Sequence, residues 1–345
     1  MTIKPTYRAV QISRPGHLEL VERPTPTPGP GEVLIAVEAC GMCGADIGDI
    51  EQAASLLNPP RVPGHEIVGR IAALGAGTQE VWKIGQRVGI GRLGGHCNTC
   101  TQCRRGEFQL CQNQTFVGAT CDGGYAEMVL ARATGLVSIP DALSSEEAAP
   151  ILCAGIATFN ALRRSDAQPG DTVAILGIRG LGHMALQYAK KMGFRVVAIG
   201  RGSDIAEDAA ALGAHLYLDT ERVDAVSTLK KMGGARAIVA TIGNADSVST
   251  LFHALAPHGR LIILGAGKDP LSIPAGMLVT GERHVIGSLT GTPSECERLL
   301  DFSLLVDARP RFETMPLERA ADAYQRLKNG APKFRMVLTI PPHSR

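Results

Sequence analysis

The stretch Val173-Ala-Ile-Leu-Gly-Ile-Arg-Gly-Leu-Gly-His183 decides the fold of the second half of this chain. Its first four residues form a short, continuously apolar run, which is typical of a strand buried on both faces. The glycine-rich turn leads into an amphipathic helix that we expect to end near Met192, and residues 195–199 form the next apolar run. Strand, helix and strand in this order predict an α/β fold with a doubly wound parallel sheet.

The same alternation continues beyond this unit and sets the expected domain boundaries. We expect a helix at 205–212 and further strands at 216–218, 237–240, 260–264 and 285–288. Residues 1–153 are instead rich in short alternating stretches punctuated by glycine and proline, with strands expected at 33–37, 67–71 and 87–90. We therefore expect one domain at 154–289 and a β-rich domain at 1–153, to which residues 290–345 return with two helices and a strand at 334–340.

Length and composition limit the classes of protein that fit. A chain of 345 residues is too long for one ordinary core, and 45% hydrophobic with 20% charged residues is typical of a globular protein. The net charge of +2 gives no reason to expect a nucleic acid partner. No apolar run approaches the roughly 20 residues that cross a bilayer, and the N-terminus has no signal-peptide pattern. We expect a cytoplasmic protein without a membrane partner, whose nine cysteines remain thiols or metal ligands.

Four cysteines at positions 97, 100, 103 and 111 have the spacing C-x2-C-x2-C-x7-C. Within one loop, this spacing places four thiolates around a single tetrahedral Zn²⁺. A closed all-cysteine shell leaves no position for a substrate, so the site would be structural. The alternative is a disulfide pair or a run of core cysteines, which a cytoplasmic setting does not favour.

A second group of candidate ligands comes from three separate segments. Cys43 lies in Cys40-Gly-Met-Cys-Gly-Ala-Asp46, His65 lies in Pro63-Gly-His-Glu-Ile67, and Cys153 lies in Pro150-Ile-Leu-Cys-Ala-Gly155. Two thiolates and one imidazole leave the fourth position of a zinc ion open, as a catalytic site requires. Taken singly, each residue is more often structural, because a lone buried cysteine usually acts as a small hydrophobe.

These segments, in their order along the chain, resemble the zinc-containing medium-chain alcohol dehydrogenases, in particular the short, often tetrameric microbial branch. The other segments that carry the resemblance are the four-cysteine loop, Asp122-Gly-Gly-Tyr-Ala-Glu127, Leu152-Cys-Ala-Gly155 and Gly180-Leu-Gly-His183. The resemblance runs from about residue 8 to about residue 340. It implies a GroES-like catalytic domain, a Rossmann cofactor domain and a homodimer or homotetramer.

The resemblance also implies roles for single residues. Glu66 would lie beside the catalytic zinc as an alternate ligand, and Asp46 would orient His65. Cys121 falls where the family often lines the substrate pocket. Thr158 would lie in the cofactor pocket, and Arg335 would contact the cofactor's pyrophosphate.

The glycine-rich turn between strand and helix is where a dinucleotide phosphate meets backbone N–H groups and a helix N-terminus. Its cofactor-binding candidates are Gly177, Arg179, Gly180, Leu181 and Gly182. In the pattern G-x-G-x-x-G, Arg179 replaces the middle glycine, a departure that puts a bulky residue where the backbone should approach the pyrophosphate.

The end of the second strand of this domain points to the cofactor type. An NAD enzyme usually places an acid there for the ribose hydroxyls, whereas this chain has Gly200 followed by Arg201. Without the carboxylate, a guanidinium can hold a 2′-phosphate. We therefore expect NADP(H) rather than NAD(H). The alternative is that Arg201 is a solvated surface residue and the specificity is relaxed.

The leading hypothesis is a zinc-dependent NADP(H) oxidoreductase with two zinc ions per chain that interconverts an alcohol and an aldehyde or ketone. Two alternatives remain: reduction of activated C=C or C=N bonds on the same scaffold, and a zinc-stabilised binding or sensor protein without turnover. Ala45 bears on this choice, because the family normally has a proton-relaying Ser or Thr there. Arg92, where relatives often place an aromatic residue, predicts an anionic or strongly polar substrate unless a protein carboxylate pairs with it.

Overall fold

The computed structural model describes residues 3–52, 60–78, 80–265 and 267–341. The chain divides into two compact units. The first is formed by Met1–Cys153 together with Gly291–Arg345, and the second by Ala154–Thr290.

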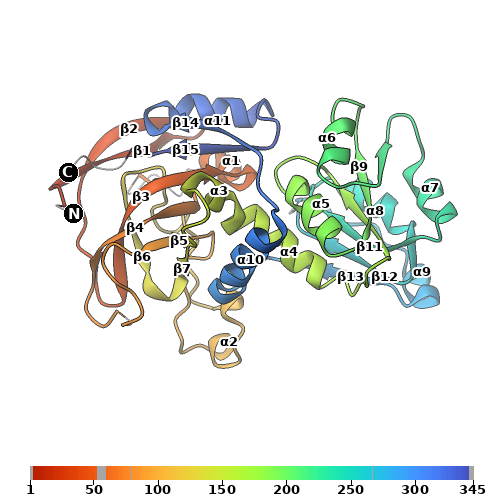
Figure 1. Cartoon of the computed structure of the whole chain (residues 1–345), viewed down its shortest axis with the longest axis horizontal. Coiled ribbons are helices and arrows are strands. Elements are labelled where there is room, and N and C mark those ends of the chain that lie inside the picture. Colours follow the sequence, from red (N-terminus) through yellow and green to blue (C-terminus); the bar gives the residue numbers. More distant parts are fainter. Residues whose placement is uncertain (1–2, 53–59, 79, 266, 342–345) are drawn as a thin grey trace. The chain divides into compact units, whose positions relative to one another are not determined.

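A mixed sheet forms the centre of the first unit, in the order β14-β15-β3-β4-β5-β7, with β6 also paired to β3 (Figure 1). Its strands are β3 (Glu32–Met42), β4 (Glu66–Leu74), β5 (Arg87–Ile90), β6 (Met128–Arg132), β7 (Val137–Ser138), β14 (Phe312–Pro316) and β15 (Arg335–Thr339). The central strand β3 is apolar except for Glu32 and Glu38, and most of its side chains are buried in the core of this unit. The antiparallel pairing of β15 with β3 ties the C-terminal part of the chain to this sheet.

A hairpin and short helices complete the first unit. The hairpin pairs β1 (Thr6–Arg14) with β2 (His17–Pro24). The helices are α1 (Gly44–Glu51), α2 (Thr101–Arg104), α3 (Ser145–Pro150), α10 (Pro293–Val306) and α11 (Ala320–Lys328), with 3-10 turns at Phe108–Leu110, Ala133–Gly135 and Leu317–Arg319. Helix α10 has a clear start signal, because Thr292 and Glu295 form a capping box and Pro293 is the first helical residue.

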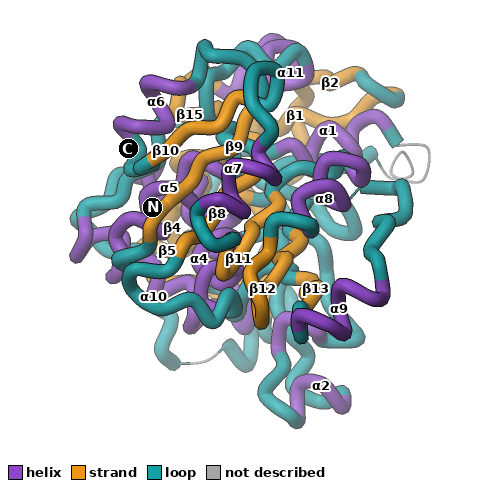
Figure 2. Tube along the Cα trace, turned by 90° about the vertical axis from the view of Figure 1, so that its right-hand side faces the viewer, coloured by secondary structure: helices purple, strands orange, loops and turns teal. Residues whose placement is uncertain are grey.

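Six parallel strands form the second unit in the order β10-β9-β8-β11-β12-β13, which Figure 2 shows side by side. They are β8 (Thr172–Leu176), β9 (Arg195–Gly200), β10 (Leu216–Asp219), β11 (Ala235–Ala240), β12 (Leu255–Ile263) and β13 (His284–Gly287). The helices are α4 (Ile156–Arg163), α5 (Gly182–Lys191), α6 (Ala206–Ala211), α7 (Ala225–Lys231), α8 (Ala245–Phe252) and α9 (Ala275–Gly281). The strand order reverses between β8 and β11, which is the switch point of a Rossmann sheet.

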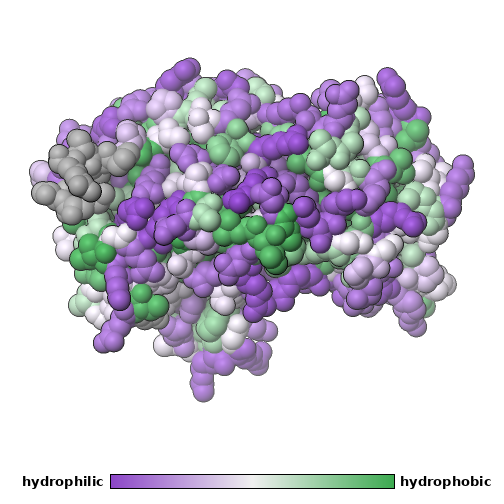
Figure 3. Space-filling model, in the orientation of Figure 1, coloured by the Kyte–Doolittle hydropathy of each residue, from purple (hydrophilic) through white to green (hydrophobic). Residues whose placement is uncertain are grey.

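The predicted fold class is therefore confirmed, with differences in detail. Strand β12 begins at Leu255 rather than at residue 260, because a shift in its pairing with β11 between Ala235 and Ala237 accommodates additional residues. Helices α7, α8 and α9 and hairpin β1–β2 were not predicted from the sequence. Among the described residues, no helix is both long and apolar enough to cross a membrane. The face in Figure 3 is largely polar, with apolar residues in small groups.

Candidate functional site

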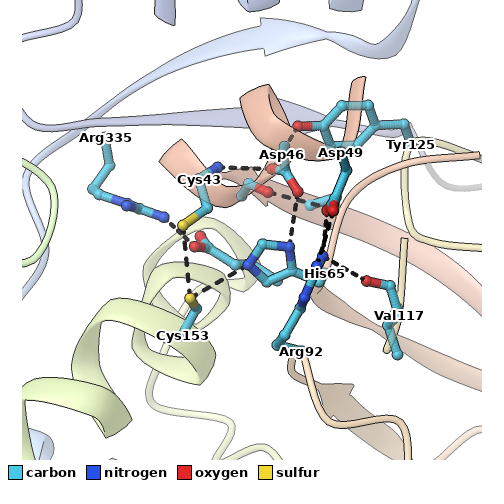
Figure 4. Close-up of polar contacts among 12 residues, drawn as sticks. Cys43, Asp46, Asp49, His65, Arg92, Val117, Tyr125, Cys153 and Arg335 are labelled. Atoms are coloured by element: carbon cyan, nitrogen blue, oxygen red, sulfur yellow. Dashed lines mark hydrogen bonds and ion pairs between the residues drawn. The ribbon is translucent and has the colours of Figure 1, made fainter. Parts of the chain in front are cut away.

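Four candidate metal ligands come together in the first unit. The ligand atoms of Cys43, His65, Glu66 and Cys153 all lie within 4.8 Å of one another. The Cys43 and Cys153 sulfur atoms are 3.8 Å apart, and the Cys153 sulfur lies 3.4 Å from Nε2 of His65. Figure 4 shows the side chains of Cys43, His65 and Cys153 pointing toward one another. All of the candidates expected for a catalytic zinc thus share one place.

The backbone around these ligands is specialised. Cys43 is the N-cap residue of α1, and Glu66 begins β4. Cys153 lies in a π-helical turn, Ile151–Gly155, and such turns often mark functional sites. Gly64, just before His65, has φ +94°, and a side chain there would come within 2.3 Å of the Tyr125 ring. Only glycine fits this close approach.

A buried carboxylate holds His65 in place. Asp46 accepts hydrogen bonds from Nδ1 of His65 (2.8 Å), the hydroxyl of Tyr125 (2.9 Å) and the backbone N–H of Cys43 (2.8 Å). With the proton on Nδ1, the Nε2 lone pair of His65 faces the cysteine sulfurs. The sequence analysis did not predict a role for Tyr125, although this residue lies in a segment that carried the family resemblance. Only the fold brings its hydroxyl to Asp46.

Burial and neighbouring charges change the acidity of these groups. The hydrogen bond with Cys153 lowers the pKa of Cys43 well below its usual value, whereas the same bond and burial raise the pKa of Cys153. Burial raises the pKa of Glu66 to about 7, although Arg335 opposes this shift. Burial alone would lower the pKa of His65. Asp46 and Cys43 together outweigh burial, so the pKa of His65 is raised well above its usual value.

Arg335 pairs with Glu66 inside the first unit. Arg335 is 3% exposed, and its Nη2 donates a hydrogen bond to Oε1 of Glu66. Among the hydrogen bonds of the described residues, the buried Nε of Arg335 and Oε2 of Glu66 have no partner. Both atoms are therefore free to contact a further group, and leaving them without one is costly.

The four cysteines of the loop at 97–111 also converge. Their sulfur atoms lie within 4.8 Å of one another, with 4.0 Å between Cys97 and Cys103 and 3.9 Å between Cys100 and Cys111. Hydrogen bonds from Thr99 and Asn113, with help from backbone N–H groups, lower the pKa of Cys97 to about 5. Zn–S bonds of about 2.3 Å in a tetrahedron place sulfur atoms about 3.8 Å apart. The thiols thus already have nearly the spacing of a zinc site.

The substrate-pocket candidates differ from expectation in one respect. Arg92 forms two hydrogen bonds with the carboxylate of Asp49, at 2.5 Å and 3.0 Å. The charge of Arg92 is therefore already paired by a protein carboxylate, which was the alternative to an anionic substrate, and the position of Arg92 no longer argues for an anion. Asp49 was missed, although its position one helical turn after Asp46 could have revealed it. Ala45 is exposed at the start of α1, and Cys121 contacts the carbonyl of Phe116 within its own loop (3.8 Å).

The glycine-rich turn of the second unit joins β8 to α5. Gly177 has φ +88°, and a Cβ at Gly182 would lie 1.9 Å from the carbonyl oxygen of Gly177, so the turn requires both glycines. Gly180 and Leu181 complete the turn, with Leu181 as the N-cap residue of α5. Arg179 is exposed, so its side chain does not fill the turn.

Two further cofactor candidates lie in the second unit, at Thr158 and at the end of β9. Thr158 is fully buried, and its hydroxyl donates to the carbonyl oxygens of Ala154 and Gly155. Gly200 ends β9, where a Cβ would lie 2.6 Å from the hydroxyl of Tyr217.

Arg201 follows Gly200 and forms an ion pair with Glu221, a residue that was not predicted from the sequence. Its side chain is 85% exposed, and its Nε donates to Glu221 over 2.7 Å. The pKa of Arg201 is raised by this partner. Both terminal nitrogens of the guanidinium remain outside this hydrogen bond.

Comparison with known proteins relates these features to a family. Residues 29–141 match the model "Alcohol dehydrogenase GroES-like domain", and residues 180–304 match "Zinc-binding dehydrogenase". The chain is 39% identical to alcohol dehydrogenase notN of Aspergillus sp. (strain MF297-2), over 99% of this chain and 100% of that protein. It is 38% identical to an alcohol dehydrogenase of Geobacillus stearothermophilus, over 96% and 98%.

A solved structure extends the likeness to the fold. The cobalt- and zinc-bound thermostable alcohol dehydrogenase of Pyrobaculum aerophilum aligns with a TM-score of 0.85 and 27% identity, over 97% of this chain and 99% of that one. Two relatives above 30% identity match almost the whole length of the chain, and two family models cover most of it. The chain belongs to the zinc-type medium-chain alcohol dehydrogenase family.

Proposed function

We propose that this protein is a zinc-dependent oxidoreductase that interconverts an alcohol and an aldehyde or ketone, with NADP(H) preferred over NAD(H). The observation that carries the proposal is the convergence of Cys43, His65, Glu66 and Cys153 beside the buried Asp46. The names of the alcohol dehydrogenase relatives support the alcohol–carbonyl chemistry.

The residues present fit a zinc ion at this cluster. Two sulfur atoms and one imidazole nitrogen form the borderline-soft donor set that zinc favours. Oε2 of Glu66 is buried without a partner among the described hydrogen bonds. This is expected of a carboxylate oxygen that faces a bound cation. The four-cysteine loop fits a second, structural zinc, because its four sulfur atoms leave no place for another ligand.

When bound, the catalytic zinc supplies a Lewis acid that polarises a carbonyl or lowers the pKa of an alcohol. The chain's own residues prepare this chemistry. Asp46 keeps the proton of His65 on Nδ1 and fixes the ring by a hydrogen bond at 2.8 Å. Arg335 compensates the charge of Glu66 inside the protein, which keeps that carboxylate beside the other ligands.

The second unit would hold the nicotinamide cofactor. The Gly177–Gly182 turn lies at the start of α5, next to the switch point of the sheet, where a pyrophosphate can approach backbone N–H groups. We also propose the expected cofactor contacts of Thr158 and Arg335, of which Arg335 has a free Nε.

Reduction of activated C=C or C=N bonds is the second candidate, favoured by one observation. Ala45 has no group that donates or accepts a proton, so a relay through this side chain is absent. A cytoplasmic location is also a proposal, supported by nine cysteines that remain available as thiols or metal ligands.

We expect zinc and turnover to be lost together when the cluster is broken. The wild type should hold two zinc ions per chain and reduce simple aldehydes with NADPH. Cys43→Ala should hold one zinc and lose about 100-fold or more in kcat/KM, because the Lewis acid is gone. Metal analysis and initial rates measure both. Cys296→Ala, at a buried position of α10, is the control and should keep both ions. Full activity of Cys43→Ala would contradict the proposal.

We expect Arg201 to set the cofactor preference. Arg201→Ala should lower the ratio of kcat/KM for NADPH over NADH by about 10-fold to 100-fold, because charge-assisted hydrogen bonds to the 2′-phosphate disappear. Glu221→Gln should raise the ratio by removing a competing carboxylate. Arg195→Ala, at the opposite end of β9, should leave it unchanged. Higher kcat/KM with NADH in the wild type would show that the assignment is wrong.

We expect a hydroxyl at position 45 to restore a proton relay. Ala45→Thr should raise the rate of alcohol oxidation, because general acid–base assistance is typically worth about 10²–10⁴-fold. Ala45→Val adds the same volume without a hydroxyl and should give no gain. The rates of enal and imine reduction serve as the comparison. If Ala45→Thr and Ala45→Val behave alike, water already carries the proton.

We propose a homodimer or homotetramer, supported by the edge of the parallel sheet. The edge strand β13 carries exposed Val285, and Val279 and Leu289 nearby are also exposed. Unpaired, apolar strand edges are usually covered. Analytical ultracentrifugation should give at least twice the chain mass of 36.3 kDa. Val285→Lys should shift the protein toward the monomer and Val81→Lys, in the first unit, should not. A monomeric wild type would refute the assembly.

A further inference from the structure

Arg92 and Asp49 form a polar pair on the segments that carry the ligand cluster. Asp49 lies on α1, the helix capped by Cys43, one turn after Asp46. Arg92 comes two residues after β5, and the intervening Gly91 packs so tightly that a Cβ there would lie 2.6 Å from the carbonyl oxygen of Leu152, the residue before Cys153. Figure 4 shows the pair in the same view as His65.

The pair leaves hydrogen-bonding capacity unused. Nη1 of Arg92 donates to Oδ2 of Asp49 (2.5 Å) and to the carbonyl of Val117 (3.3 Å), and Nη2 donates to Oδ1 of Asp49 (3.0 Å). A guanidinium has five N–H donors. Within the part of the chain that the structure describes, Nε–H and one N–H of Nη2 therefore have no partner. Each oxygen of Asp49 also retains a lone pair.

The environment of the pair is neither open solvent nor closed core. The side chains of Arg92 and Asp49 are 23% and 16% exposed. The centroid of the Phe116 ring lies 6.0 Å from the guanidinium carbon, so an apolar surface adjoins the polar one. A ligand that covered this place without hydrogen bonds would leave the remaining donors desolvated and unpaired, which is costly.

We propose that Arg92 and Asp49 together bind a neutral hydroxyl group of the substrate. A hydroxyl both donates and accepts, and it can therefore use a free N–H of Arg92 and a lone pair of Asp49 at the same time. A carboxylate would be attracted by one partner and repelled by the other, so the pair does not select an anion. The substrates would be hydroxylated alcohols and their aldehydes or ketones, and this rests on the proposed alcohol–carbonyl function.

The test compares matched substrates in the zinc-loaded enzyme. The probes are ω-hydroxyaldehydes of two to five carbons, the aldehydes with methyl in place of the hydroxyl, and the corresponding ω-oxo acids. We expect the wild type to favour a hydroxyaldehyde over its methyl counterpart by at least about 10-fold in kcat/KM at one or more chain lengths, because a site built for a hydroxyl rejects the analogue that lacks it. Asp49→Ala/Arg92→Met should reduce this ratio to about one.

Two further variants separate the pair's role from a general loss of structure. Asp49→Asn leaves the charge of Arg92 uncompensated, so the ω-oxo acids should gain at least about 10-fold relative to the methyl aldehydes. Arg70→Met removes an exposed arginine that pairs with Glu38 on the same sheet and should leave every ratio unchanged. A double variant that keeps the wild-type preference overturns the proposal.

Binding provides a readout that does not require turnover. Calorimetry of the zinc-loaded protein with NADP⁺ compares terminal diols with alkanols of equal size, in the wild type and the double variant. If a diol binds more tightly than its alkanol and this difference disappears in the double variant, the role of the pair is supported. An absence of turnover would then contradict only the proposed function. Equal binding of diols and alkanols by the wild type overturns the inference.

Discussion

The carboxylate of Asp46 is the centre on which the arrangement of the ligand cluster depends. It is fully buried and accepts hydrogen bonds from an imidazole, a phenol and a backbone amide. A buried carboxylate is costly unless such donors satisfy it. The same three bonds connect the start of α1, the residue before β4 and the segment that contains Tyr125, so satisfying one charge also positions Cys43 and His65. The burial of Asp46 is therefore tied directly to the orientation of the candidate metal ligands Cys43 and His65.

Charges around the cluster are paired within the protein rather than left for a ligand. Arg335 compensates Glu66, and Asp49 compensates Arg92. Both pairs retain unused donors or acceptors. A paired arginine contributes hydrogen bonds without a net charge, which is the basis of the proposal that the Arg92–Asp49 pair binds a neutral hydroxyl group. For this reason Arg92, taken without its partner Asp49, did not indicate the charge of the substrate.

Much of the fold was predictable because its signals are local. The apolar run at 173–176, the glycine turn and the helix after it lie in β8, the turn and α5, and the predicted parallel sheet is present. The four-cysteine loop was predicted from ligand type and spacing, whereas the second cluster was predicted from ligand types together with the family resemblance, which alone supplied Glu66. Tyr125, Asp49 and Glu221 were missed because each meets its partner through the fold, over separations of 79, 43 and 20 residues, although the position of Asp49 on the helix after Asp46 was a usable signal. Arg179 replaces the middle glycine of the turn without crowding it, because its side chain is exposed. The sequence alone does not specify the direction of that side chain.

X-ray absorption at the zinc edge, combined with metal analysis, tests the central claim that this chain holds zinc at two chemically different sites. The account predicts two zinc ions per chain, one with four sulfur neighbours and the other with two sulfur and lighter nitrogen or oxygen neighbours. In Cys103→Ser the remaining spectrum should be that of the mixed site, and in Cys43→Ala that of the all-sulfur site. A wild type with a single zinc ion, or with four sulfur neighbours at both sites, would contradict the account.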